Sequence, residues 1–167
     1  MVENSRTYYA MSSAPGRSAT STIRISGDRS LESLSKLTKI NSVNFIHSKT
    51  FVCHIYNKTN ILIDESVVVY YRSPNSYTGE DVVEIHTHGN PLVVQAVFDE
   101  LDSFGLNIAE PGEFTRNAYL NNKIDLIQAE AVFSLINAQS NSGVELSLTN
   151  TAGKLSTHIK TLRTSLI

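Results

Sequence analysis

Hydrophobic and polar positions alternate along the first part of the chain, as they do in strands that bury one face. The clearest run covers residues 81–88, where β-branched side chains favour extended backbone. A period of two then places Glu84, His86 and His88 on one face of this strand. Comparable runs bring the number of predicted strands to six, over residues 7–12, 22–26, 50–56, 66–72, 81–88 and 106–109.

Segments with the spacing of apolar residues typical of helices lie between some of these strands. The leucines of residues 31–37 recur at helical intervals. Residues 91–104 form a second predicted helix, with Pro91 in its first turn and Gly105 just beyond its end. Strands mixed with helices in this order predict an α+β or α/β domain.

After Glu110 the strand pattern stops and helical patterns take over. A brief helix is expected up to Asn121 and Asn122, and Asp125 with Gln128 resembles a capping box for a helix that runs to about Ala138. We therefore expect an N-terminal domain over residues 1–120 and the first part of a helical domain over residues 121–167.

An apolar stripe follows with steps of four or three residues, as expected for one long helix that packs against other helices. The stripe consists of Val144, Leu148, Ala152, Leu155, Ile159, Leu162 and Leu166. Because the sequence stops at Ile167 without a helix-ending signal, we expect a fragment of a longer protein.

The composition is that of an ordinary globular protein, and the formal net charge of -2 argues against a strongly basic nucleic-acid surface. Cys53 is the one cysteine and lies in an apolar strand, so we expect a buried core residue rather than a reactive thiol. The N-terminal residues lack the pattern of a signal peptide, which favours a cytoplasmic location with no membrane partner. No phosphate-loop motif occurs in the sequence.

Two charged residues stand among apolar neighbours in predicted strands. Glu84 lies between Val83 and Ile85, and a carboxylate there needs either an internal partner or a ligand with several N–H donors, such as a pterin or purine edge. Arg24 lies between two isoleucines and has the opposite requirement. A structural Arg24–Glu84 ion pair satisfies both without any ligand, so the residues alone leave the two interpretations open.

Other interpretations of the polar residues are possible. Glu84, His86 and His88 have the chemistry of metal ligands, which defines the alternative of a small metal-dependent hydrolase. Metal sites usually take a ligand from a second helix, strand or loop, and the sequence shows no matching motif for one, so no metal site is predicted. Lys123 alone would be a solvated surface lysine.

Four segments of the chain are distinctive: APGRSATSTIRISG, PNSYTGEDVVEIHTHGNP, PGEFTRNAYLNNKIDLIQAEAV and GKLSTHIKTLR, at residues 14–27, 74–91, 111–132 and 153–163. In this order they resemble the N-terminal region of the MnmE (TrmE) family of tRNA modification GTPases. The resemblance implies an α+β fold with a mixed β-sheet, similar to tetrahydrofolate-binding aminomethyltransferase domains (GcvT-like), followed by a helical segment. It also implies homodimerisation and a folate site, with Arg24, Glu84 and Lys123 as the cofactor-binding residues.

The resemblance also implies a role in modifying carbon 5 of the tRNA wobble uridine, with a 5-formyl- or methylene-tetrahydrofolate donor and an FAD-dependent partner of the MnmG (GidA) type. GTP, Mg and K belong to a G domain that this sequence lacks, so we expect no catalysis by this chain alone. Where the family has a glycine-rich stretch after Gly16, this chain has Arg17, Ser18, Ala19 and Thr20. Those side chains favour the alternative of a dimerisation scaffold with a degenerate folate pocket.

Overall fold

The structure is a computed structural model that describes residues 6–165. The chain divides into two compact units, one that ends at Phe114 and one that begins at Thr115. Each unit is described by itself below. The predicted domain division at residue 120 stays a prediction.

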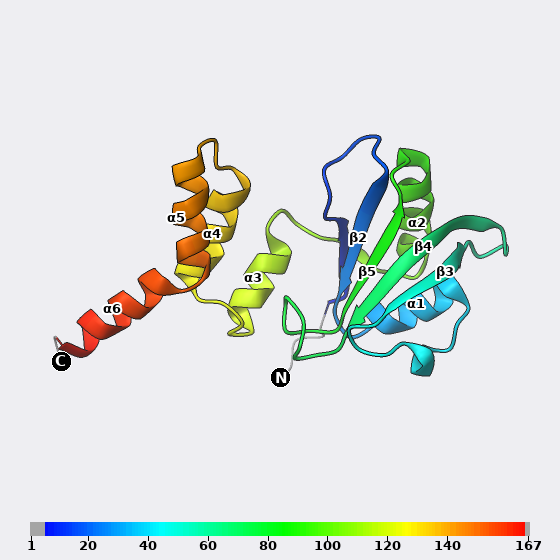
Figure 1. The fold of residues 1–167 in the computed structure, drawn as a ribbon. Coiled ribbons are helices and arrows are strands. Elements are labelled where there is room, and N and C mark those ends of the chain that lie inside the picture. The colour runs from blue at the N-terminus through cyan, green and yellow to red at the C-terminus, as the bar shows by residue number, and fades with distance from the viewer. Residues whose placement is uncertain (1–5, 166–167) are drawn as a thin grey trace. The chain divides into compact units, whose positions relative to one another are not determined.

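The first unit holds six strands and two long helices (Figure 1). The strands are β1 (Tyr8–Met11), β2 (Thr20–Ser26), β3 (Thr50–Tyr56), β4 (Leu62–Tyr71), β5 (Val82–His88) and β6 (Asn107–Ile108). The helices are α1 (Ser30–Thr38), the short 3-10 helix η1 (Ser42–Asn44) and α2 (Pro91–Ser103). Helix α3 (Glu113–Leu120) begins at the end of this unit.

The six strands form one mixed sheet in the order β3-β4-β5-β2-β1-β6. The pairing of β1 with β6 is parallel, and the other four pairings are antiparallel. A mixed sheet with helices is the α+β fold expected from the sequence, and the six predicted strands are confirmed.

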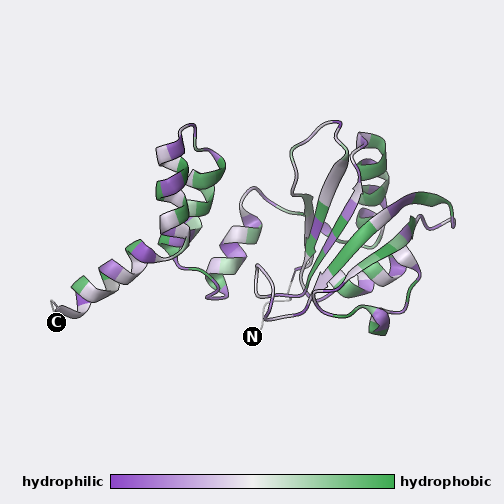
Figure 2. Cartoon of the chain, in the orientation of Figure 1, coloured by the Kyte–Doolittle hydropathy of each residue, from purple (hydrophilic) through white to green (hydrophobic). Residues whose placement is uncertain are grey.

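Both α1 and α2 cover the same face of this sheet (Figure 1). Apolar side chains from the strands and from these helices form one core, in which Ile23, Ile85 and Leu101 are fully buried. Figure 2 shows the corresponding hydrophobic segments on β4, β5 and α2. Burial of one face is what fixes the strand register, because a slip by one residue would expose this whole set.

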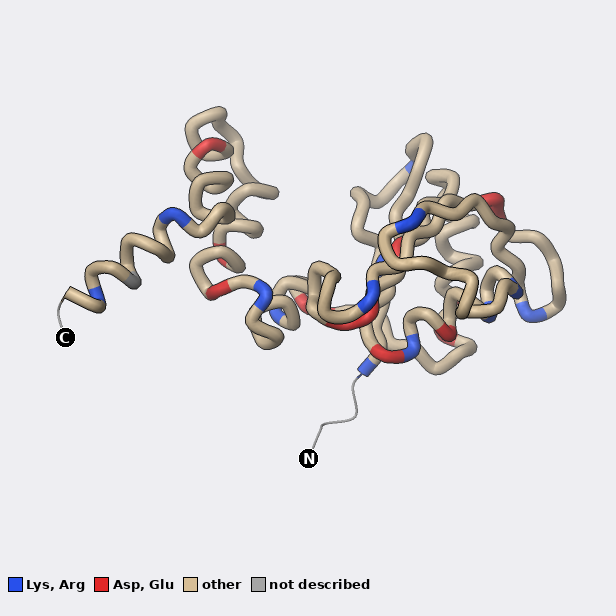
Figure 3. Tube along the Cα trace, turned by 60° about the horizontal axis from the view of Figure 1, so that its bottom comes forward, with Lys and Arg blue, Asp and Glu red and all other residues tan. Residues whose placement is uncertain are grey.

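The opposite face carries the polar positions of the same strands. In the pairing of β2 with β5, Arg24 lies opposite Glu84 and Thr22 opposite His86. The predicted face of Glu84, His86 and His88 is therefore confirmed, since Val83, Ile85 and Thr87 between them are buried. Lys and Arg are interspersed with Asp and Glu along the described trace (Figure 3).

Strand β4 begins four residues before the predicted start, at Leu62 instead of Ser66. The turn after β3 is tight: the amide of Asn57 donates to the carbonyl of Ile61 at 3.0 Å, and its side chain accepts from the amide of Ile61 at 2.8 Å. Pairing with β3 resumes at once, so the polar residues Asp64 and Glu65 lie inside the strand. Strand β2 likewise begins earlier than predicted, at Thr20.

The second unit continues with helices α4 (Leu126–Ile136), α5 (Asn141–Thr151) and α6 (Lys154–Ser165). The predicted capping box of α4 is confirmed, with Asp125 and Gln128 bonded to each other's backbone amides at 3.0 Å. The side chain of Gln128 also donates to the carbonyl of Thr151 at 2.9 Å, which joins the start of α4 to the end of α5.

The prediction of one long helix along the apolar stripe is wrong. Gly153 adopts a positive φ of 79° and ends α5, so the stripe is divided between α5 and α6. Leu148, Ile159 and Leu162 are exposed in the second unit. Leu166 and Ile167, the last residues of the sequence, lie outside the described residues.

Among residues 6–165, no helix has the length and apolar character needed to span a membrane.

Truncation of Ile85 tests the core. Ile85→Ala removes a fully buried side chain from the central strand β5, so we expect the free energy of unfolding of the first unit to fall by about 2 to 5 kcal/mol. Val52→Ala on β3 is the control, because Val52 is 68% exposed and should change stability by less than about 1 kcal/mol. Urea unfolding followed by tyrosine fluorescence measures both. Equal effects of the two substitutions would contradict the described register.

Candidate functional site

Arg24 and Glu84 meet on the face of the sheet opposite the core. Both Nε and Nη2 of Arg24 donate to the same oxygen of Glu84, Oε1, at 2.9 and 2.7 Å. Their side chains are 24% and 17% exposed, so this is a partly buried ion pair. Each residue thus has the internal partner of opposite charge that its apolar surroundings in the sequence require. The second oxygen, Oε2, accepts no hydrogen bond from a described residue and lies 3.9 Å from Nε2 of His86.

Aromatic rings hold the guanidinium of Arg24 in place. Its central carbon lies 5.4 Å from the ring centre of Tyr77 and 5.5 Å from that of Phe114, both within the range of cation–π attraction. Phe114 in turn packs on Tyr8 with ring centres 5.0 Å apart. An arginine held by two rings and a carboxylate has little freedom to move, so the orientation of Glu84 is fixed as well.

A cavity of about 340 Å³ opens beside this pair. It is lined by Tyr71, Asn75, Ser76, Tyr77, Val82 and Glu84. Burial, with a smaller contribution from the charge of Glu84, raises the pKa of the Tyr71 hydroxyl, which therefore stays protonated at neutral pH. The cavity thus combines one carboxylate acceptor with two aromatic rings, a lining suited to a flat ligand that has N–H donors.

The segment Tyr77 to Asp81 is fixed by a network of side chains below the cavity. Oε2 of Glu80 accepts from the hydroxyls of Tyr8 at 3.0 Å and of Ser26 at 2.7 Å. Ser26 also bonds Thr78 at 2.7 Å, and both residues are buried. These bonds explain the Tyr-Thr-Gly-Glu-Asp sequence, since Thr78 and Glu80 anchor the loop that carries Tyr77 over Arg24.

The histidines of β5 have separate partners. Nδ1 of His86 bonds the hydroxyl of Thr22 at 3.0 Å. His88 bonds Asp64 instead, through its ring Nδ1 at 2.7 Å and its backbone amide at 2.9 Å. Within residues 6–165, no three His, Cys, Asp or Glu side chains are grouped so as to hold a metal ion. The metal-dependent alternative therefore has no ligand set in the described part of the chain.

The loop that replaces the glycine-rich stretch is attached to the end of β5. The amide of Ser18 donates to the carbonyl of Gly89 at 3.0 Å, and the amide of Gly89 donates to that of Ala19 at 3.2 Å. A Cβ at position 89 would lie 2.3 Å from the Ser18 carbonyl oxygen, so only glycine fits there. Arg17, Ser18 and Ala19 line a cavity of about 470 Å³ with residues 88–90, and they do not line the cavity beside Glu84.

Lys123 belongs to the second unit, where it is exposed in the turn between α3 and α4. Its amide donates to the carbonyl of Ala118 at 2.8 Å. A pocket shared by Lys123 with Arg24 and Glu84 stays a prediction.

Several residues of the site were not predicted from the sequence. Tyr71, Tyr77 and Phe114 belong to separate segments, and only their placement around Arg24 and Glu84 gives them a role. The partner of His88 was not predicted because Asp64 lies before the predicted start of β4 at Ser66, outside any predicted strand. Cys53 was correctly predicted to be buried, and burial raises its pKa to about 11.

The fold and the site together define a class: an α+β domain in which the sheet face opposite the core presents a fixed carboxylate beside an aromatic-lined cavity. Residues 7–123 match the family model described as the GTP-binding protein TrmE N-terminus. Since this match covers most of the sequence, the chain belongs to that family, which confirms the resemblance seen in the sequence.

Curated relatives carry the name tRNA modification GTPase MnmE. The chain is 46% identical to that of Fervidobacterium nodosum, with 98% of this chain and 36% of the relative covered. It is 39% identical to that of Campylobacter curvus, with 95% and 35% covered, and 39% identical to that of Aliarcobacter butzleri, with 100% and 37% covered. The chain therefore spans about a third of the length of these relatives.

The Asp64–His88 pair predicts a specific pH dependence. The hydrogen bond to Asp64, followed by its charge, raises the pKa of His88, so the imidazolium is stabilised in the folded state. The stabilisation should be fully present below the unfolded pKa of about 6.5 and should disappear as the pH rises through the raised pKa. NMR titration of the His88 ring should show a lower pKa in Asp64→Asn than in the parent chain. Asp99→Asn, on the exposed side of α2, should leave that pKa unchanged, and an unchanged value in Asp64→Asn would refute the pair.

Proposed function

We propose that this chain is the folate-binding and dimerising part of a tRNA modification GTPase. The observation that carries the proposal is Glu84, which is oriented by Arg24 through one oxygen while its second oxygen accepts no hydrogen bond from a described residue. Membership of the TrmE N-terminal family supports the same conclusion.

The residues beside the cavity fit a tetrahydrofolate derivative. The pterin ring of such a cofactor is flat and has N–H donors, and an ionised carboxylate that only accepts hydrogen bonds is the matching partner. Glu84 would take this ring edge, with Tyr71 and Tyr77 against its faces. The volume of about 340 Å³ lies within the range of small-molecule sites but towards its lower end, which fits the ring part of the cofactor.

Two cationic residues complete the proposed site. Arg24 holds Glu84 in a fixed orientation through two hydrogen bonds to its Oε1. Lys123, on the second unit, would meet the anionic tail of the cofactor. The bound folate, as the 5-formyl or methylene form, supplies the one-carbon unit for the modification.

The proposal extends to the intact protein. The relatives are about three times as long as this chain, and their name includes a GTPase. We propose a homodimer that acts in the cytoplasm with an FAD-dependent MnmG (GidA) partner on carbon 5 of the tRNA wobble uridine. GTP with Mg and K would bind in the G domain outside this chain. The proposed likeness to GcvT-type aminomethyltransferase domains rests on the same resemblance.

A dimerisation scaffold without folate is the alternative. It was favoured by the side chains that replace glycines after Gly16. Arg17, Ser18 and Ala19 line a different cavity from the one beside Glu84, which leaves the proposed ring site open. The folate proposal is therefore the better supported of the two.

Calorimetric titration with 5-formyltetrahydrofolate tests the proposal. Glu84→Gln keeps the size of the side chain but replaces one acceptor oxygen by a donor, so we expect binding to weaken by about tenfold or more. Lys123→Ala should also weaken binding, by a smaller factor, because an exposed charge contributes less than a partly buried one. Glu65→Gln is the matched control, since Glu65 is an exposed carboxylate on β4 that does not line the cavity.

Sedimentation of the same samples distinguishes the alternatives. A dimer that binds no folate would support the scaffold, whereas a monomer that binds folate would remove dimerisation from the proposal. Folate binding that survives Glu84→Gln at full strength would mean that the ligand occupies another site.

A further inference from the structure

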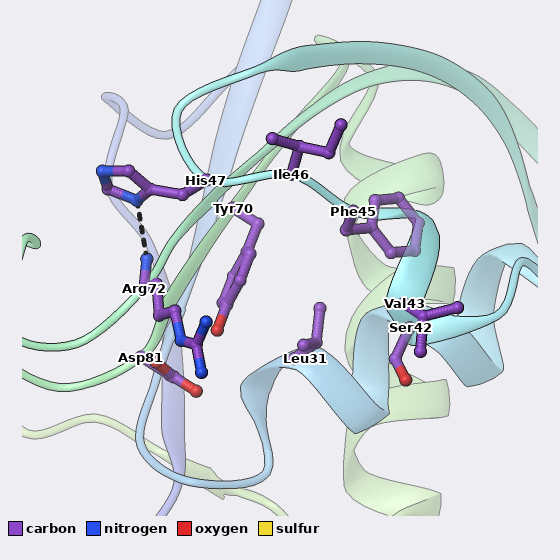
Figure 4. Close-up of a pocket in the computed structure, with 9 residues that line it drawn as sticks. All are labelled: Leu31, Ser42, Val43, Phe45, Ile46, His47, Tyr70, Arg72 and Asp81. Carbon is purple, nitrogen blue, oxygen red and sulfur yellow. Dashed lines mark hydrogen bonds between the residues drawn. The ribbon is translucent and has the colours of Figure 1, made fainter.

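A further cavity of the first unit lies away from Glu84, beside α1 and η1. Its volume is about 610 Å³, within the range of small-molecule sites. Figure 4 shows its nine lining residues around one open space. They are Leu31, Ser42, Val43, Phe45, Ile46, His47, Tyr70, Arg72 and Asp81.

One wall of this cavity is apolar. Phe45 is 6% exposed and lies deep in it, while Val43 and Ile46 are 80% and 50% exposed and form its rim. Leu31 contributes from α1 (Figure 4). Exposed aliphatic side chains around a buried ring offer contacts to an apolar group of similar size.

The facing wall is polar, and it comes from the ends of two neighbouring strands. Tyr70 and Arg72 stand at the end of β4, and Asp81 precedes β5 (Figure 4). Asp81 is oriented by the backbone amide of Ser73, which donates to its Oδ1 at 2.8 Å. Burial, followed by the charge of the nearby Asp81, raises the pKa of Tyr70 to about 12, which keeps the hydroxyl protonated and able to donate.

The backbone of Arg72 is fixed by a hydrogen bond, whereas its guanidinium is not. Its amide donates to Nδ1 of His47 at 3.0 Å, so this ring nitrogen is the acceptor of that bond. The guanidinium of Arg72 makes no hydrogen bond or ion pair with any side chain of residues 6–165. The polar wall thus presents one cation and one anion, each with hydrogen-bonding capacity to spare.

We propose that this cavity binds a free α-amino acid with a branched or aromatic apolar side chain. The carboxylate would pair with the guanidinium of Arg72, and the ammonium group with Asp81. The side chain would lie against Phe45 and Ile46. A simple anion or cation would satisfy only one of the two charges and be repelled by the other, whereas a zwitterion with an apolar side chain matches both walls.

This cavity is independent of the proposed folate site because of the alternation of β4. Tyr70 faces the core side of the sheet with Phe45, while the next residue, Tyr71, faces the other side and lines the cavity of Glu84. Success or failure of one site therefore says nothing about the other.

The test is a titration of the ¹⁵N-labelled chain with L-phenylalanine, followed by NMR. We expect the amide signals of Phe45, His47 and Arg72 to shift. Three truncated probes should each bind about tenfold more weakly or worse: 3-phenylpropionate lacks the ammonium group, phenethylamine lacks the carboxylate, and glycine lacks the side chain.

Variants assign the two charges. Arg72→Gln should weaken the binding of L-phenylalanine by about tenfold or more and leave the affinity for phenethylamine unchanged. Asp81→Asn should weaken the binding of L-phenylalanine but not that of 3-phenylpropionate. The asparagine keeps a side-chain oxygen that can accept the hydrogen bond from the Ser73 amide. Arg163→Gln, which changes an exposed arginine on α6, is the control that should leave the affinity for L-phenylalanine unchanged.

The proposal is overturned by any of three results. One is the absence of shifts at these amides up to the solubility limit of L-phenylalanine. Another is equal affinity for L-phenylalanine and 3-phenylpropionate. The last is unchanged affinity in Arg72→Gln whose amide spectrum shows a folded chain.

Discussion

The pairing of β2 with β5 is the constraint on which the first unit depends, because it serves both faces of the sheet at once. Ile23 and Ile25 oppose Ile85 and Val83 in the core, and the residue between the two isoleucines, Arg24, opposes Glu84 on the other side. A slip of one residue would bury the charges and expose the isoleucines, at a cost comparable with the whole stability of a typical domain. The hydrophobic core therefore sets the geometry of the ion pair.

The same alternation of side chains allows the two faces of one sheet to line two different cavities. Tyr70 and Tyr71 are adjacent in the sequence, yet each contributes its ring to a different cavity on a different side. On the core side the neighbours are α1, η1 and buried rings. On the other side, the pair of Arg24 and Glu84 is held by Tyr77 and Phe114.

Most of the architecture was predictable because it depends on local periodicity. The six strands, the helix that begins at Pro91 and the cap at Asp125 all follow from patterns within a few residues. The errors arose where one residue or one turn overrides the pattern. Gly153 ends a helix that the apolar stripe would have continued, and the tight turn at Asn57 lets β4 begin among polar residues.

The candidate site was predictable only in part, for a physical reason. Arg24 and Glu84 were identified because a charge between apolar neighbours in a strand is costly and needs an explanation. Tyr77 and Asp64 have no such local anomaly, since a tyrosine in a loop and an aspartate after a turn are ordinary. Their roles exist only in three dimensions, through the contacts with Arg24 and His88.

Gly89 has a consequence for how this chain tolerates substitution. The loop before β2 is held at this point by main-chain hydrogen bonds, which are indifferent to the side chains of Ser18 and Ala19. Those residues, and Arg17 beside them, can therefore be exchanged while the path of the loop is kept. The reverse does not hold, because a single methyl group at position 89 would collide with the Ser18 carbonyl. We therefore expect a mutational scan of this chain to find residues 17–19 more tolerant of substitution than Gly89.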